Sequence, residues 1–224
     1  MLKKLTVLNF QSQKISGVLH ENQSKTLLII VPGYQTSKED FAIKELATQL
    51  SKKYSVFRYD LADGINIAQH ERDLDLVINF LRPKFEKIVL IGASLGALIS
   101  IINVNKRGTS VDKLITVNGF FYFWGLRWKD FKLIILTFLT FPFNGLSQKI
   151  LINYYSFLKP KNINIPMLLI CGKKDERINF KQSKKFYESL VGNKTLKILD
   201  NIDHGLSKKE YVTSVVKEIF RWLK

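Results

Sequence analysis

Apolar and polar residues along this chain switch repeatedly between two patterns. Short apolar runs, typical of buried strands, are followed by segments with apolar residues three or four positions apart, typical of helices. The predicted strands are residues 4–10, 14–20, 26–31, 55–59, 88–91, 113–117, 166–171 and 196–199. The predicted helices are residues 39–52, 67–81, 95–104, 180–190 and 208–223.

This order of elements predicts an α/β fold, a mostly parallel twisted sheet of about eight strands with helices on both faces. The first two strands lie close together and alternate, which predicts an antiparallel hairpin at the start of the chain. In the helix over residues 39–52, we expect the apolar stripe to contain Phe41, Leu46, Ala47 and Leu50. Sheets of this kind bind ligands beyond the carboxyl ends of their strands, so candidate chemistry is sought there.

Residues 119–160 break the alternation of strands and helices. This segment holds half of the sixteen phenylalanines and two of the three tryptophans, Trp124 and Trp128. It is too long and too apolar for a plain loop, which predicts a short aromatic-rich helical lid. The sequence therefore divides into a core domain, residues 1–118 and 161–224, and a lid or cap, residues 119–160. The apolar stretch 133–143 is too short to span a bilayer, and favours either core packing or contact with lipid or a second copy.

Composition limits the chemistry that the chain can carry. Its 224 residues fit one domain with a full core, since 46% of them are hydrophobic. The single cysteine, Cys171, lies in an apolar run and predicts a buried inert thiol. No two of the three histidines have ligand spacing on one helix, so we expect no metal site and no cofactor. No signal-length apolar stretch follows the first residues, which predicts a cytoplasmic protein.

The net charge of +16 has two readings. It fits attraction to an anionic membrane, nucleic acid or acidic substrate. However, lysines are spread along the whole chain and no arginine-rich or aromatic-basic motif is present, so compositional bias is favoured and no nucleic-acid partner is expected. A basic surface would still aid weak contact with an anionic membrane surface.

The strongest chemical signal is the segment Gly92-Ala93-Ser94-Leu95-Gly96. It joins a predicted strand to a predicted helix, the arrangement that lifts a serine hydroxyl out of a parallel sheet. Side chains two residues before and after the serine would collide with the turning strand and helix, which explains the two glycines. Taken alone, Ser94 also fits a small helix-start residue in a non-catalytic fold.

Two further polar residues follow late strands and fit a base and an acid for this serine. Asp175 follows the strand over 166–171, and His204 follows the strand over 196–199. Ser94, Asp175 and His204 can therefore meet at one edge of the sheet. Glu176, Asp200 and Asp203 remain alternative acids, because each lies close in sequence to Asp175 or His204. His20 and His70 are expected to be structural or solvated, and Asp60 and Asp63 to be structural loop residues.

With these motifs the chain resembles the α/β-hydrolase family, in particular its small esterase, lipase and monoacylglycerol-lipase-like members. The resemblance runs from about residue 26 to the end, and its matching segments are 31–34, 58–64, 92–96, 172–175 and 203–205. It implies an eight-stranded hydrolase fold with Ser94 as nucleophile, His204 as general base and acid, and Asp175 as the orienting acid. It also implies that the backbone N–H groups of Tyr34 and Leu95 form the oxyanion hole. Pro32 departs from the family, which usually has histidine before this glycine.

The expected function follows from this set of residues. We expect a serine hydrolase that cleaves small-molecule carboxylic esters with apolar acyl or aryl groups through an acyl-enzyme. Alternatives are an acyl thioesterase with the same triad, or a non-catalytic ligand-binding protein of the same fold. The sequence does not define the oligomeric state. The predicted substrate pocket is lined by Tyr34, Phe120, Phe121, Tyr122, Phe123 and Trp124, although aromatics that pack the lid onto the sheet would give the same pattern.

Overall fold

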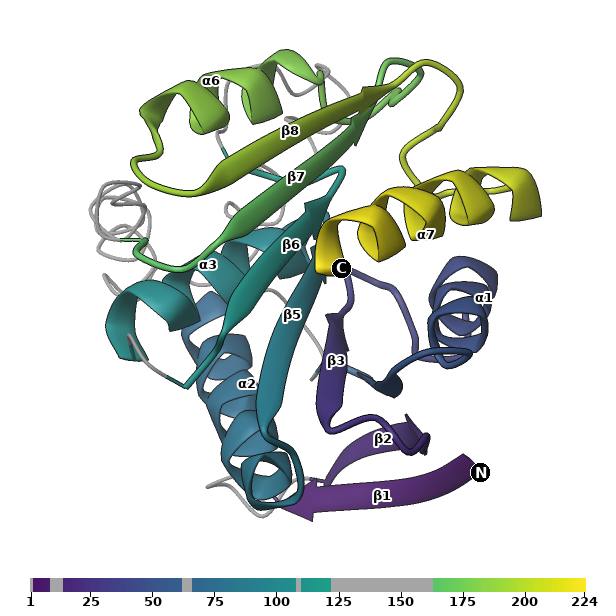
Figure 1. Ribbon diagram of the computed structural model, residues 1–224, viewed down its shortest axis with the longest axis vertical. Helices are drawn as coiled ribbons and strands as arrows, with labels where there is room; N and C mark the ends of the chain where they lie inside the picture. Colours follow the sequence, from purple (N-terminus) through teal and green to yellow (C-terminus); the bar gives the residue numbers. More distant parts are fainter. Residues whose placement is uncertain (1, 9–13, 62–65, 108–109, 122–162) are drawn as a thin grey trace, which may run out of the picture.

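The alternating pattern folds into one eight-stranded sheet flanked by helices in a computed structural model of the chain (Figure 1). The structure describes residues 2–8, 14–61, 66–107, 110–121 and 163–224. The strands are β1 (Leu2–Leu8), β2 (Lys14–His20), β3 (Thr26–Val31), β4 (Ser55–Tyr59), β5 (Lys87–Ala93), β6 (Lys113–Val117), β7 (Met167–Gly172) and β8 (Lys194–Leu199). The helices are α1 (Phe41–Leu50), α2 (Ile67–Leu81), α3 (Leu95–Arg107), α6 (Lys181–Ser189) and α7 (Lys209–Leu223), with a 3-10 turn at Arg82–Lys84 after α2.

The strand order is β1-β2-β4-β3-β5-β6-β7-β8. β2 pairs antiparallel with both β1 and β4, and every other pair is parallel. The predicted class, a mostly parallel sheet of about eight strands that begins with an antiparallel hairpin, is confirmed. Because β3 to β8 all run the same way, their carboxyl ends share one edge, where the loops that carry Tyr34, Ser94, Asp175 and His204 begin.

Helices cover both faces of the sheet (Figure 1). Along β3, Leu27 and Ile29 belong to the apolar cluster that contains α2, α3 and α6, whereas Leu28 and Ile30 belong to the cluster that contains α1 and α7. All four side chains are fully buried. Burying one such side chain stabilises a protein by roughly 1.5–3 kcal/mol, so the continuous apolar runs of the sequence build a two-layered core.

Phe41 is the one residue placed wrongly in the predicted apolar stripe of the first helix. It is 50% exposed, whereas the buried residues of α1 are Ile43, Leu46, Ala47 and Leu50. These four follow the helical repeat of three and four residues. Phe41 lies two positions before Ile43, about 200° away around the helix, and so points away from the sheet.

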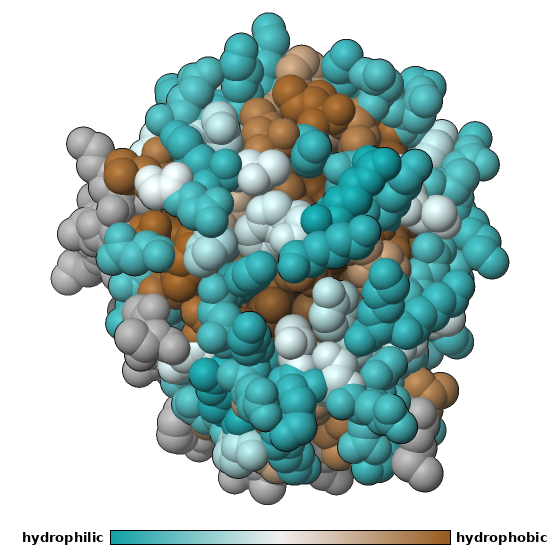
Figure 2. All heavy atoms as spheres, viewed as in Figure 1, coloured by the Kyte–Doolittle hydropathy of each residue, from teal (hydrophilic) through white to brown (hydrophobic). Residues whose placement is uncertain are grey.

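Several expectations fall on residues outside the described part of the chain. Only the first three residues of the predicted lid, 119–121, are described, so the lid and the domain boundaries stay predictions, as does the role of the apolar stretch 133–143. Asp63 also lies outside the described residues. None of the described helices is long and apolar enough to cross a bilayer. On the face shown in Figure 2, hydrophilic side chains cover most of the surface, in keeping with lysines spread along the chain.

Cys171 is a buried residue of β7, as its apolar neighbours predict. Its side chain is 1% exposed, and burial raises the pKa of its thiol to about 11. The thiolate is the reactive form of cysteine, so this thiol is inert at neutral pH.

A buried histidine–arginine contact joins β2 to β4 and gives a prediction for stability. Arg58 Nε donates to His20 Nε2 at 3.0 Å, and the His20 side chain is only 7% exposed. Burial, and then the positive charge of Arg58, lower the pKa of His20 to about 4, while the nearby Glu39 opposes this shift. Unfolded His20 takes up a proton near pH 6.5, so its stabilising contribution is full above that pH and is lost as the pH falls towards 4.

We therefore expect His20→Gln to make stability less sensitive to acid. A glutamine oxygen can accept the Arg58 hydrogen bond but takes up no proton. Between pH 7 and pH 4.5 the variant should lose about 2 kcal/mol less unfolding free energy than the wild type. Urea unfolding at the two pH values measures this difference, and equal losses in both proteins would contradict the explanation.

Candidate active site

The sharp turn between β5 and α3 holds Ser94 in a conformation that few residues adopt. Its φ angle is +50°, in the left-handed region. Two backbone bonds tie this turn to neighbouring segments: Ser94 N–H donates to Val117 O at 3.1 Å, and Phe120 N–H donates to Ser94 O at 3.1 Å. The elbow is thus tied to β6 and to the residues that follow it, and the hydroxyl is presented at the carboxyl edge of the sheet.

The two glycines of the elbow allow a very close approach of backbone segments. A Cβ atom at Gly92 would lie 2.6 Å from Gly96 O, and one at Gly96 would lie 2.1 Å from Val31 O. Both distances are far below any contact that a real Cβ makes, and the opposing atoms belong to backbone. The sequence-based explanation, that side chains there would collide with the turning strand and helix, is confirmed for Gly92, which faces α3, whereas at Gly96 the collision is with the end of the neighbouring strand β3.

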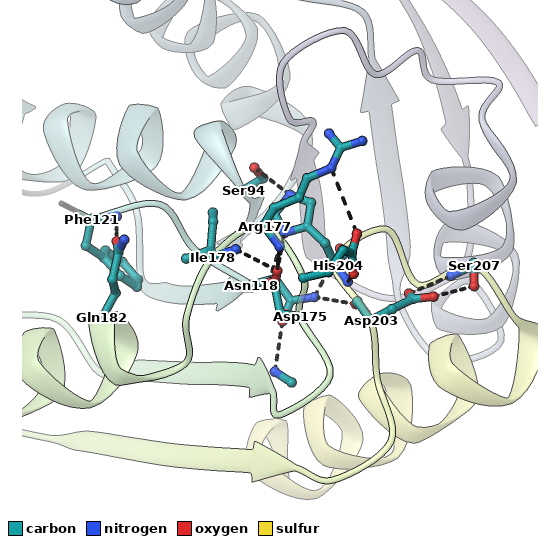
Figure 3. Close-up of polar contacts among 12 residues, drawn as sticks. Ser94, Asn118, Phe121, Asp175, Arg177, Ile178, Gln182, Asp203, His204 and Ser207 are labelled. Atoms are coloured by element: carbon teal, nitrogen blue, oxygen red, sulfur yellow. Dashed lines mark hydrogen bonds and ion pairs between the residues drawn. The ribbon is translucent and has the colours of Figure 1, made fainter. Parts of the chain in front are cut away.

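Ser94, His204 and Asp175 come together in a continuous chain of hydrogen bonds (Figure 3). Ser94 Oγ lies 3.1 Å from His204 Nε2, and His204 Nδ1 lies 3.0 and 2.9 Å from the two oxygens of Asp175. A carboxylate only accepts hydrogen bonds, so Nδ1 carries the proton and Nε2 offers its lone pair to the serine hydroxyl. This tautomer is the one that a base for Ser94 requires.

The Asp175 carboxylate is held in place from its own loop. Its Oδ1 accepts hydrogen bonds from Arg177 N–H at 2.9 Å and from Ile178 N–H at 2.7 Å. The side chain is 2% exposed, and that of His204 is 11% exposed. The two backbone donors fix the orientation of the carboxylate toward His204, which suits a group that orients the imidazole.

The other acids near His204 make different contacts, so among the described residues only Asp175 reaches the imidazole. Glu176 accepts from the backbone N–H of His204 at 3.3 Å. Asp203 accepts from Ser207 N–H at 2.9 Å and from its hydroxyl, and so turns away from the ring. Asp200 is an exposed partner of Lys173.

The residues that the resemblance assigns to the oxyanion hole, Tyr34 and Leu95, lie in two segments next to the serine, and the role of their N–H groups stays a prediction. Leu95 N–H is at the first position of α3, where helix geometry leaves the amide without an intrahelical partner. Tyr34 lies in the loop after β3, and its neighbour Gly33 is so close that a Cβ there would lie 3.2 Å from Ser94 Cβ. The loop with Tyr34 thus passes directly beside the nucleophile, and the Tyr34 side chain is 36% exposed.

The predicted pocket residues receive different placements. Phe121 is fully buried, and its ring stacks on Phe186 with centroids 4.4 Å apart and planes at 4°. It is therefore a core residue and not a wall of an open pocket, which corrects the expectation: the alternative of aromatic core packing describes it. Phe120 is 8% exposed and touches the elbow through its backbone. Tyr122, Phe123 and Trp124 lie outside the described residues.

Asn118 is a site residue that the sequence reasoning missed. It follows β6 directly, has a φ angle of +47° and is 2% exposed. Its Nδ2 donates to Asp203 O at 2.8 Å and to His204 O at 3.0 Å, while its Oδ1 accepts from Gly172 N–H at 2.9 Å (Figure 3). One carboxamide thus ties the histidine loop to the end of β7. Like Asp175 and His204, Asn118 follows a predicted strand, and this position could have marked it as a candidate.

We expect Asn118→Asp to lower kcat/KM for esters by about 10–100-fold, because a small displacement of a catalytic group costs this much. Aspartate keeps the size and backbone preference of asparagine, but its oxygen would face two carbonyl oxygens and push the histidine loop away. Asn22→Asp is the matched control, since Asn22 also bridges backbone groups, Ser51 O at 2.9 Å and Ser24 N–H at 3.1 Å, at the other edge of the sheet. Equal ester hydrolysis by the two variants would contradict this role.

Fold and site together define the chain as a serine hydrolase of the α/β-hydrolase class. Residues 74–224 match the sequence pattern of the prolyl oligopeptidase family, and this range contains Ser94, Asp175 and His204. The chain belongs to that family. No curated protein matches the sequence significantly.

Solved structures with a similar fold carry esterase names. The esterase domain of a Rhodothermus marinus protein shares 18% identity and a TM-score of 0.73, and the match covers 99% of this chain and 97% of that one. The Pyrococcus furiosus esterase Pf2001 shares 21% identity and a TM-score of 0.75, with 99% and 90% covered. Est1E from Butyrivibrio proteoclasticus shares 16% identity and a TM-score of 0.74, with 97% of each chain covered. At these identities the likeness establishes the fold.

Proposed function

We propose that this protein hydrolyses carboxylic esters with apolar acyl or aryl groups, with Ser94, His204 and Asp175 as its catalytic triad. The observation that carries the proposal is the 3.1 Å contact between Ser94 Oγ and a His204 ring whose other nitrogen faces Asp175. A serine hydroxyl is a weak nucleophile unless such a base takes its proton. The esterase names of the similar structures support ester hydrolysis, and the family membership supports a hydrolase in general.

The reaction runs in two halves. Ser94 Oγ adds to the ester carbonyl carbon, its proton passes to His204 Nε2, and the carbonyl oxygen becomes an oxyanion beside the N–H groups of Tyr34 and Leu95. The oxyanion collapses, the bond to the alcohol oxygen breaks, and His204 gives its proton to that oxygen. Water then adds to the acyl-enzyme with His204 as base, and the acid leaves with Ser94 restored. Asp175 stabilises the imidazolium in each half.

A fluorophosphonate probe tests the nucleophile directly. Attack by Ser94 displaces fluoride and leaves a stable phosphonyl adduct, which mass spectrometry of a digest locates. We expect the adduct on the peptide that contains Ser94, together with turnover of p-nitrophenyl butyrate that ceases as labelling completes. Absence of both, or an adduct elsewhere with activity lost in parallel, would overturn the proposal. A protein that binds esters without labelling would be the non-catalytic receptor.

Hydrolysis of peptide bonds is the second candidate function, and the family match favours it. The same triad cleaves amides when the site also delivers a proton to the leaving amine. Rates on p-nitrophenyl esters and on matched amino-acid p-nitroanilides separate the two activities. An acyl-CoA substrate beside a glycerol ester of the same chain length separates thioesterase from esterase, and a series of acyl lengths defines the pocket.

A further inference from the structure

The loop between β3 and α1, residues 32–40, carries one of the two N–H groups proposed for the oxyanion hole. The described hydrogen bonds within the loop that involve residues 33–36 are long: Thr36 N–H to Gly33 O and Thr36 Oγ1 to Tyr34 O, both 3.4 Å. Shorter bonds of 3.1 Å begin at Ser37, which pairs with Asp40. Gln35, next to Tyr34, has a φ angle of +54°, a conformation of higher energy for a residue with a side chain. The position of the Tyr34 N–H group therefore depends on what holds the loop further along.

Asp60, directly after β4, holds this loop three to four residues beyond Tyr34. Its Oδ1 accepts from Lys38 N–H at 2.7 Å and from Ser37 Oγ at 3.2 Å, and its Oδ2 pairs with the Lys38 ammonium. The ion pair is partly sheltered, since the Lys38 side chain is 16% exposed and that of Asp60 is 33% exposed. A charged acceptor with several donors makes a stronger anchor than the neutral contacts near Tyr34.

A side chain of β4 itself, Arg58, also contacts this loop, at Lys38 and Glu39. Arg58 donates to Lys38 O and to Glu39 Oε1, the latter at 2.9 Å, and is itself oriented by His20. The Arg58 side chain is 4% exposed, whereas that of its partner Glu39 is 52% exposed, so the contact is shielded from solvent on the Arg58 side only. Asp60 therefore fixes the N–H group of Lys38 and Arg58 fixes its C=O group, and together they fix the course of the loop beside Ser94.

We propose that Asp60 is a positioning residue for the oxyanion hole: it anchors residues 37–38 so that the Tyr34 N–H group faces the carbonyl oxygen of the bound ester. The inference rests on the proposed function and extends it to a residue outside the range that matches the family, residues 74–224. A donor held for the transition state contributes chiefly to kcat. Loss of Asp60 is thus expected to slow the chemical step and to leave substrate binding nearly unchanged.

The matched control is Asp112, which has the same kind of contacts at the opposite edge of the sheet. It accepts from Ile88 N–H at 2.8 Å and from Arg82 Nη1 at 3.0 Å, and its side chain is 36% exposed, close to the value for Asp60. Replacing either aspartate by alanine removes one backbone hydrogen bond and one ion pair, and at Asp60 it also removes the 3.2 Å bond from Ser37 Oγ. The two variants therefore carry a similar structural loss, and only one of them disturbs the loop beside Ser94.

The experiment compares the wild type with Asp60→Ala, Asp60→Asn and Asp112→Ala on p-nitrophenyl butyrate. We expect Asp60→Ala to lower kcat by about 10–100-fold with KM changed by less than about threefold, since removing an oxyanion donor outright costs about 100–1,000-fold. Asp60→Asn, which keeps an oxygen for Lys38 N–H, should recover part of the rate. Asp112→Ala should keep the wild-type kcat.

A trifluoromethyl ketone provides the readout that a merely structural role would not change. Ser94 Oγ adds to its carbonyl carbon, the proton passes to His204, and the carbonyl oxygen becomes an oxyanion that requires the Tyr34 N–H group. If Asp60→Ala lowers kcat by a given factor, the inhibition constant of the ketone should rise in that variant by about the same factor. In Asp112→Ala the inhibition constant should stay unchanged.

Each outcome of this comparison decides something. Equal kcat values for Asp60→Ala and Asp112→Ala, or a higher KM with an unchanged kcat, would overturn the role of Asp60. If Asp60→Ala does not fold, Asp60→Asn decides by the same two measurements. A wild type that neither turns over esters nor reacts with a fluorophosphonate would refute the proposed function itself, which is a different result.

Discussion

Replacing Ser94 by alanine is expected to lower kcat/KM for p-nitrophenyl butyrate by at least about 10,000-fold, the effect of removing a nucleophile that acts together with its base. The substitution removes the hydrogen bond between Ser94 Oγ and His204 Nε2, whereas the backbone bonds of the elbow involve no side-chain atom and remain. The fold should therefore persist, with a melting temperature close to that of the wild type. Stopped assays with enough protein to detect a rate this low measure the effect.

The control for this substitution is Ser214→Ala. Ser214 is exposed on α7 and its hydroxyl donates to Glu210 O at 2.9 Å, one turn earlier in the same helix. This variant should match the wild type in both turnover and fluorophosphonate labelling. Turnover at the wild-type rate by Ser94→Ala would mean that another group attacks the ester, and the assignment of the nucleophile would be wrong.

The second large effect is expected on stability, from Gly96→Ala. The added Cβ would lie 2.1 Å from Val31 O and 2.5 Å from Pro32 O, both backbone atoms at the end of β3. Neither β3 nor α3 can move without disturbing the core, so we expect a loss of about 3 kcal/mol or more. For a domain of this size that corresponds to a melting temperature lower by about 6–12 °C.

Gly205→Ala serves as the comparison for this effect. A Cβ at Gly205 meets no described atom within 4 Å, so the same chemical change is made without a collision. Thermal unfolding should give nearly the wild-type curve for Gly205→Ala and a clear shift for Gly96→Ala. Indistinguishable curves for the two variants would show that the elbow tolerates a side chain and that the close contact is not what selects glycine.

The elements that the sequence predicts well are those with a repeating apolar pattern. The bounds of β2, β3, β4, α2 and β6 agree residue for residue with the structure. The order of strands and the position of the polar residues after them also predict that Ser94, Asp175 and His204 share one edge. Both results depend on local periodicity and on a general property of parallel sheets.

The placements that sequence reasoning misses depend on contacts between distant segments. Asn118 reaches groups 54 and 86 residues away, and nothing in its local sequence distinguishes it from an ordinary residue after a strand. Phe121 is aromatic like its neighbours, yet its stacking partner Phe186 comes from α6. Asp60 follows β4 as a loop residue, as expected. Its proposed positioning role depends on its contacts with residues 37–38 of the loop between β3 and α1, which the local sequence does not indicate.

The buried position of Cys171 makes this protein convenient for measurements of motion. Its single thiol is inaccessible and unreactive at neutral pH, so a cysteine introduced at the surface becomes the sole site for a maleimide dye or a nitroxide. No native cysteine has to be removed first. A label attached through Gln35→Cys would then report by fluorescence or electron paramagnetic resonance how tightly the segment beside the nucleophile is held, with and without an inhibitor.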